Sequence, residues 1–103
     1  MAIKFKIAEE DYKFVKKIAD DNDLDLQDTI DAMYEYFTDT KDESKVFGKE
    51  TWSCKNEVEV KTTYYRIIEW EEEYQLKSHI IFTYITECIF NEIEDFKKMF
   101  ELI

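Results

Sequence analysis

Hydrophobic and polar side chains alternate at the start of the chain. In residues 2–7, Ile3, Phe5 and Ile7 occupy every second position. Successive side chains of a strand point to opposite faces, so these three residues would share one face and leave Ala2, Lys4 and Lys6 on the other. The pattern predicts a short strand with one buried face.

The apolar spacing then changes to intervals of three and four residues, which is the period of an amphipathic helix. It does so in residues 9–21 and again in residues 26–37. The predicted buried stripes are Tyr12, Val15, Ile18 and Ala19 in the first segment and Leu26, Ile30, Met33 and Phe37 in the second. One strand and two short helices cannot enclose a core, so we expect an obligate homodimer in which residues 2–7 pair between the two copies.

A strand, a helix, a polar turn and a second helix follow one another from Ile3 to Phe37, in the sequence IKFKIAEEDYKFVKKIADDNDLDLQDTIDAMYEYF. This third of the chain resembles the ribbon-helix-helix family of DNA-binding dimers, which includes phage repressors and antitoxins. The resemblance implies that Ala2, Lys4 and Lys6 read bases in the major groove. It also implies that the start of the second helix, residues 25–27, holds a DNA phosphate.

The start of this second helix is acidic. Residues 20–37 contain seven acidic residues and no basic one, and the whole chain has a formal net charge of −11. An aspartate at the N-cap accepts hydrogen bonds from the N–H groups that would otherwise bind a phosphate. We therefore expect Asp25 to cap the helix and, together with Asp28 in its first turn, to keep phosphate away.

The middle of the chain predicts a linker followed by a hairpin. Residues 39–50 are charged and polar and contain the only glycine, Gly48, which is typical of a linker. Residues 57–70 are rich in β-branched and aromatic side chains, which favours a strand paired with residues 51–54. Such a strand would place on one face Val58, Val60, Thr62, Tyr64, Ile68 and Trp70. A helix with Val60, Tyr64 and Ile67 or Ile68 facing inward is the alternative.

A long amphipathic helix is predicted from Ser78, as its N-cap, to the end of the chain. Its apolar stripe comprises Ile81, Tyr84, Ile85, Cys88, Ile89, Phe96, Met99, Phe100 and Ile103. Glu92 falls within this stripe and Phe90 on the opposite side. The predicted fold is thus α+β and mainly helical, with a ribbon-helix-helix-like dimerisation unit (residues 1–38), a linker (39–50), and a β-hairpin plus C-terminal helix (51–103).

The chain offers little catalytic chemistry. It has one histidine, His79, and two cysteines, Cys54 and Cys88, that lie too far apart for a C-x-x-C motif. A single glycine excludes the glycine-rich phosphate and nucleophile motifs. We therefore expect no enzyme activity, no cofactor and no metal site. The chain also has neither a signal peptide nor an apolar run long enough to span a membrane, so we expect a cytoplasmic protein with no membrane partner.

Two functions fit these residues. The first is an acidic, non-enzymatic binding protein, such as an inhibitor or regulator of phage or mobile-element type, that contacts a basic nucleic-acid-handling enzyme or a toxin by resembling DNA in its charge. Its expected partner-binding residues are Asp20, Asp21, Asp25, Asp28, Trp70, Glu71, Glu72, Glu73, Tyr74 and Phe90. The second is a ribbon-helix-helix repressor or antitoxin that reads DNA with Lys4 and Lys6.

Overall fold

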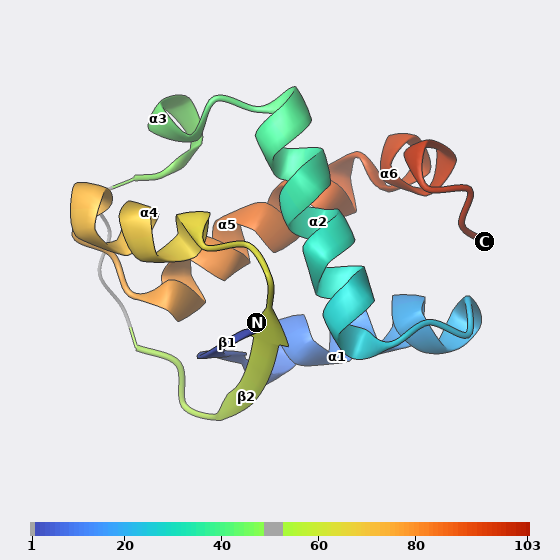
Figure 1. The fold of residues 1–103 in the computed structure, drawn as a ribbon, viewed down its shortest axis with the longest axis horizontal. Coiled ribbons are helices and arrows are strands. Elements are labelled where there is room, and N and C mark those ends of the chain that lie inside the picture. The colour runs from blue at the N-terminus through green and yellow to red at the C-terminus, as the bar shows by residue number, and fades with distance from the viewer. Residues whose placement is uncertain (1, 49–52) are drawn as a thin grey trace.

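The computed structural model describes residues 2–48 and 53–103 (Figure 1). Within them the fold is α+β and mostly helical, as the sequence predicts. The elements are β1 (Ile3–Ala8), α1 (Glu9–Asp21), α2 (Leu26–Thr40), α3 (Glu43–Val46), β2 (Glu57–Thr62), α4 (Arg66–Tyr74), α5 (Ser78–Asn91) and α6 (Ile93–Met99). The predicted N-terminal strand and the two helices that follow it are confirmed as elements, with α2 running three residues further than expected.

The partner of β1 is β2 of the same chain. The two strands pair antiparallel, with Phe5 opposite Val60 and Ile7 opposite Val58. This corrects the argument for strand exchange between two copies, because the edge of β1 that was expected to need a second chain is already paired. Association of two copies stays a prediction, but the fold does not depend on it.

The core that the N-terminal unit lacks comes from the second half of the chain. Figure 1 shows α5 crossing behind α2 and α4, and α5 also packs against β1. Ile85 of α5 and Ile30 of α2 are fully buried in a single hydrophobic cluster. Every helix and strand contributes to this cluster or packs against it, the short α3 through Val46. The unit formed by β1, α1 and α2 is therefore enclosed by elements that follow it in the same chain.

The segment predicted as a linker is partly structured and contributes to this core. Residues 39–40 extend α2, and α3 follows after a short connection. Phe47 is buried and stacks on Phe37, with ring centroids 5.5 Å apart. An aromatic ring in this position removes enough apolar surface from water to hold the segment against α2 and α4. The rest of the predicted linker, residues 49–50, lies outside the described residues.

The predicted strand over residues 57–70 is only half right. β2 ends at Thr62 because Asp31 of α2 binds the backbone and side chains there: its carboxylate accepts hydrogen bonds from Thr62 Oγ1 at 2.6 Å, from Thr63 Oγ1 at 2.8 Å and from the Thr63 N–H at 3.0 Å. The chain then turns into α4. The expected pairing with residues 51–54 is not found for Ser53 and Cys54, which do not belong to a strand. Thr51 and Trp52 lie outside the described residues.

The predicted long C-terminal helix is wrong as a single helix: it breaks at Glu92, and its second part ends at Met99 rather than at the end of the chain. α5 ends at Asn91 and α6 begins at Ile93, while Glu92 itself has a non-helical backbone (φ −125°, ψ 36°). The break brings the Glu92 carboxylate to α2, where it accepts a 2.6 Å hydrogen bond from the Tyr36 hydroxyl and pairs with Lys41. It also lets Phe96 pack edge to face on Tyr36. At the other end, Ser78 is the first helical residue and Lys77 the N-cap.

This junction generates a pH-dependent prediction. The hydrogen bonds from Lys41 and Tyr36 hold the pKa of Glu92 below its ordinary value of 4.5, so Glu92 stabilises the fold above that pH and the contribution is lost as the pH falls through the lowered folded-state pKa. Glu92→Gln should therefore lower the unfolding temperature most at neutral pH, and the difference from wild type should shrink below about pH 4.5. Thermal unfolding followed by circular dichroism across this range measures the effect.

Glu94→Gln is the matched control, because Glu94 is exposed in the neighbouring helix and makes no ion pair among the described residues. It should change the unfolding temperature little at any pH. If both variants changed the unfolding temperature by the same amount at every pH, the Tyr36–Glu92–Lys41 contact would not stabilise the junction.

Candidate functional site

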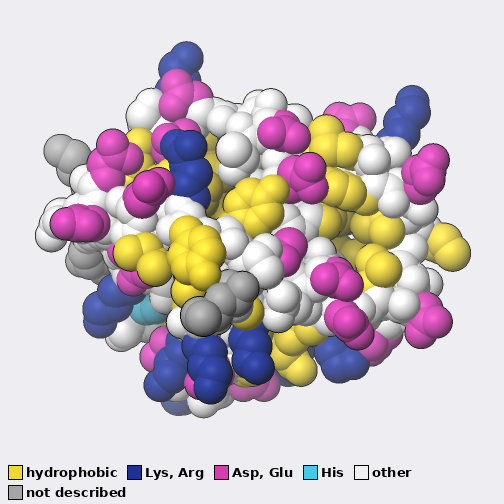
Figure 2. All heavy atoms as spheres, in the orientation of Figure 1, with side chains coloured by type: hydrophobic (Ala, Val, Ile, Leu, Met, Phe, Trp, Pro, Cys, Tyr) yellow, Lys and Arg dark blue, Asp and Glu magenta, His cyan; other side chains and the backbone are white. Residues whose placement is uncertain are grey.

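Helix α4 has a buried inner face and a mixed outer face. Ile67 and Trp70 point into the core. The outer face repeats at helical spacing and combines two large apolar side chains, Tyr65 and Ile68, each about half exposed (51% and 50%), with the exposed Glu69 and Glu72. The helix stops at Gln75, which adopts a left-handed conformation (φ 54°). Figure 2 shows hydrophobic side chains between acidic ones over the part of the surface where α4 lies in Figure 1.

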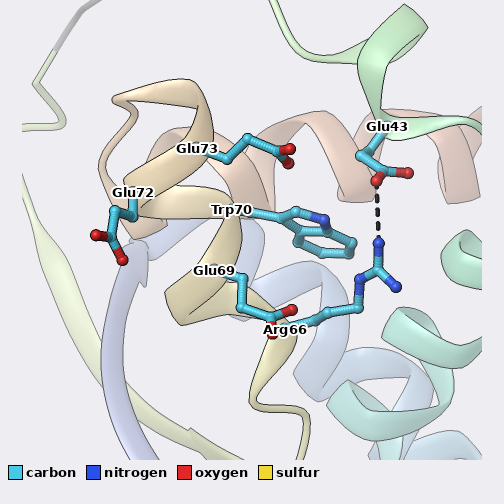
Figure 3. Close-up of a pocket in the computed structure, with 6 residues that line it drawn as sticks. All are labelled: Glu43, Arg66, Glu69, Trp70, Glu72 and Glu73. Atoms are coloured by element: carbon cyan, nitrogen blue, oxygen red, sulfur yellow. Dashed lines mark hydrogen bonds and ion pairs between the residues drawn. The ribbon is translucent and has the colours of Figure 1, made fainter.

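A shallow pocket beside this face is lined by four glutamates, one arginine and one tryptophan (Figure 3). These residues are Glu43, Arg66, Glu69, Trp70, Glu72 and Glu73, and we call them the α4 pocket. The Arg66 guanidinium lies over the Trp70 ring, 5.6 Å from its centroid, and pairs with Glu43 of α3 at 3.0 Å. Arg66 is thus already used by one carboxylate and one aromatic ring.

The remaining carboxylates of the α4 pocket are unpaired. Within the described part of the chain, Glu69, Glu72 and Glu73 form no ion pair. Three negative side chains on one nine-residue helix repel each other, and water and salt screen that repulsion only in part. A cationic partner would relieve it.

The predicted binding run at residues 70–74 is only partly on the surface. Trp70, expected as an exposed anchor, is 1% exposed and packs between Phe37 and Phe47 at 5.7 and 5.4 Å. Tyr74 is half-buried and packs edge to face on Phe47. Glu71 is half-buried, and this burial raises the pKa of its carboxyl group. The helical period of α4 turns these three residues inward and leaves Glu72 and Glu73 outside.

The acidic residues expected at the α1–α2 turn are on a different part of the molecule, on the opposite side from α4 in Figure 1. Asp20 and Asp21 are paired within α1, with Lys16 at 2.7 Å and Lys17 at 2.9 Å. Their charge is therefore locally balanced, and the predicted binding residues do not form one continuous surface.

The expected cap of α2 also differs from the prediction. Asp25 occupies the N-cap position, but its side chain accepts no hydrogen bond from the helix; instead its backbone carbonyl accepts from the Thr29 N–H and hydroxyl. Asp28 is exposed in the first turn. The two carboxylates still place negative charge at the helix N-terminus, but Asp25 does not occupy its N–H groups.

Phe90 lies in a third place, on the outer side of α5. It is 66% exposed, as the sequence predicts for a residue opposite the buried stripe. Its ring meets that of Phe14 of α1 edge to face, with centroids 6.2 Å apart, and Glu10 and Glu87 flank the pair. This small aromatic patch is exposed at one side and acidic at its rim.

Lys4 and Lys6 are exposed on the outward face of β1, as expected from the alternation. In the two-stranded ribbon, Lys4 lies opposite Lys61 and Lys6 opposite Glu59. Figure 2 shows Lys and Arg side chains gathered along the edge of the molecule beneath the strands. The basic residues of this face are therefore segregated from the acidic surface of α4.

Two features were missed in the sequence. The first is the outer face of α4, which the helical alternative for residues 57–70 would have indicated through the spacing of Tyr65, Ile68, Glu69 and Glu72. The second is a group of metal-ligand types, Cys54, Glu57 and His79, whose donor atoms all lie within 4.8 Å of one another. No spacing rule connects His79 with the other two, so only the fold could bring them together.

Comparisons with known proteins add no identity to this geometry. No protein-family model, no curated protein and no solved structure matches the chain. The resemblance of residues 3–37 to ribbon-helix-helix proteins thus finds no support among them. In the part of the chain that the structure describes, none of the helices is both long and apolar enough to cross a membrane.

The position of Trp70 predicts a stability effect rather than a binding effect. Trp70→Ala would leave a large cavity between Phe37 and Phe47 and should cost about 3–5 kcal/mol of unfolding free energy. Ile68→Ala, on the exposed face of the same helix, should cost less than about 1 kcal/mol. Urea unfolding of both variants measures the difference, and similar losses would mean that the inner and outer faces of α4 are wrongly assigned.

Proposed function

We propose that this protein is an acidic, non-enzymatic binding protein whose α4 surface docks on a basic protein, such as a nucleic-acid-handling enzyme or a toxin. It would act as an inhibitor or regulator of phage or mobile-element type. One observation carries the proposal: the outer face of α4 presents Tyr65 and Ile68 beside Glu69 and Glu72, and these carboxylates have no ion-pair partner among the described residues.

This combination suits a charged protein partner better than a neutral one. Exposed aromatic and aliphatic side chains supply the apolar contact on which interface affinity depends, and acidic side chains around them select a partner with lysines or arginines. The net charge of −11 would steer such a partner to the surface from a distance. The nucleic-acid-binding groove of an enzyme has the required positive charge, and the glutamates would take the places of phosphates.

The proposal includes a reducing, cytoplasmic environment. Cys54 and Cys88 are both free thiols in the structure, which fits a compartment in which thiols stay reduced. It also requires no catalytic step, because the expected activity is occupation of the partner's groove.

The test is affinity capture from nuclease-treated lysate with the wild type and two charge variants. Glu69→Gln, Glu72→Gln and Glu73→Gln together remove three negative charges from α4. Glu94→Gln, Asp95→Asn and Glu101→Gln remove the same number from exposed positions at the C-terminal end. The wild type and the C-terminal variant should retain a basic protein that is released by raised salt, whereas the α4 variant should lose it at least tenfold.

The two outcomes that oppose the proposal are distinct. Equal loss in both triple variants would mean that net charge alone attracts the protein and that α4 is not a docking surface. Retention by both would mean that the partner binds elsewhere, for example at Phe90. Ile68→Ser, which leaves the charge unchanged, should weaken capture as well if the apolar part of the α4 face contributes.

DNA binding is the second candidate function, and one observation favours it. β1 and β2 form a two-stranded antiparallel ribbon, an element that fits the major groove, with Lys4, Lys6 and Lys61 exposed on its outer face. Against it, Glu57 and Glu59 share that face, and the whole chain is strongly acidic.

These charges predict weak binding to duplex DNA, no tighter than about 10 µM at physiological salt. An electrophoretic mobility-shift titration measures it, with Lys4→Ala plus Lys6→Ala as the test variant and Lys97→Ala plus Lys98→Ala as a charge-matched control. Nanomolar binding to one DNA sequence that only the strand variant abolishes would establish the DNA-binding function in place of the acidic docking one.

A further inference from the structure

Three side chains with different metal-binding atoms meet where β2 begins. Cys54 lies just before the bend that precedes the strand, Glu57 is the first residue of β2, and His79 lies in the first turn of α5. Their ligand atoms all lie within 4.8 Å of one another, and His79 Nδ1 is 3.9 Å from a Glu57 carboxylate oxygen. We propose that Cys54, Glu57 and His79 bind a divalent transition-metal ion of the zinc class.

The donor set selects the class of ion. A thiolate sulfur, an imidazole nitrogen and a carboxylate oxygen together suit Zn²⁺ and its neighbours, whereas Mg²⁺ and Ca²⁺ take oxygen ligands almost exclusively. Ligand atoms around a tetrahedral zinc ion lie roughly 3.3–3.8 Å apart, given metal–ligand distances of about 2.0–2.3 Å. The three side chains would therefore have to move together by only about 1 Å.

The fold fixes the backbone of two of the three ligands, Glu57 and His79. Glu57 is paired with Ala8 across the ribbon, and the Asn56 carbonyl before it accepts a 3.0 Å hydrogen bond from the Glu9 N–H at the start of α1. His79 is 4% exposed and sits on a helix that crosses the core. A metal site needs such fixed positions, because ligands that must first be ordered bind weakly.

A buried carboxylate beside the cluster favours a cation. Asp11 of α1 is 8% exposed and interacts electrostatically with both His79 and Cys54. It lines a surface pocket beside Cys54, whose other charged residues are of both signs: Glu9, Glu10, Lys13 and Lys55. A divalent ion would offset the cost of holding the Asp11 carboxylate away from water. The three protein ligands leave the fourth position for water, and the pocket beside Cys54 gives it access.

Cobalt(II) added to the reduced full chain tests the site, because cobalt bound to a thiolate in tetrahedral geometry gives an absorption band that cobalt bound by carboxylates lacks. The wild type should develop this band with a single ion per chain, and zinc(II) should displace it. Cys54→Ser should abolish the band, and Glu57→Gln should weaken zinc binding by more than about tenfold. Glu57 is partly exposed, so its replacement tests a ligand without disturbing the buried His79.

Cys88→Ser is the matched control, since Cys88 is the other free thiol and is also partly buried. It should bind cobalt and zinc as the wild type does. Zinc binding of equal strength in wild type and Cys54→Ser, without a thiolate band, would mean an adventitious ion on surface carboxylates only and would overturn the proposal. A cobalt–thiolate band that Cys88→Ser abolishes and Cys54→Ser leaves unchanged would also overturn the proposal. Neither result bears on docking at α4.

Discussion

The backbone hydrogen bonds between β1 and β2 join the first residues of the chain to its middle, and the positions of both candidate sites depend on them. β1 alone would expose Ile7 and Phe5; paired with β2 it lies against α5, where the Ser78 hydroxyl also donates to the Lys6 carbonyl at 3.3 Å. Once β2 is fixed, its two ends are fixed as well. Its first residue, Glu57, meets His79. Its last residue, Thr62, is held by Asp31, and the chain turns there before α4 begins at Arg66.

The aromatic residues then fill the space that this pairing encloses. Trp70 on α4, Phe37 on α2 and Phe47 after α3 contact one another edge to face or stacked, at centroid distances of 5.4 to 5.7 Å. Each such pair adds to the hydrophobic gain of burial, and the three rings join α2, α4 and the segment after α3. The inner face of α4 is thus used for stability, which leaves only its outer face for a partner.

Local structure could be predicted from the sequence because its causes are local. The alternation in residues 2–7 and the three-to-four spacing after it specify β1, α1 and α2 without reference to the rest of the chain. The errors have distant causes. Asp31 ends β2 through contacts with residues 62 and 63, and Tyr36 and Lys41 hold the Glu92 carboxylate where α5 ends. In both cases the residues in contact lie too far apart in the sequence for periodicity to reveal the contact.

The candidate sites follow the same rule. The exposure of Phe90 and of Lys4 was predictable, because each lies on a face defined by its own element. The meeting of Cys54 with His79 was not, because it requires β2 and α5 to be packed together. Trp70 was placed on the wrong side because its neighbours Glu71 to Glu73 are acidic, and acidity in sequence says nothing about which helical face each residue occupies.

Charge on this molecule is also distributed unevenly, and ion pairing is the reason. The lysines of α1 are used within their own helix, where Lys13, Lys16 and Lys17 each pair with the acidic residue four positions before or after. Such exposed pairs contribute little stability, but they cancel the field of their carboxylates at short range. α4 has no lysine, and its one arginine is bound to Glu43. The excess negative charge therefore remains where exposed apolar side chains accompany it. This combination, rather than the net charge, distinguishes α4, and also the Phe90 patch with Glu10 and Glu87 at its rim, from the rest of the acidic surface.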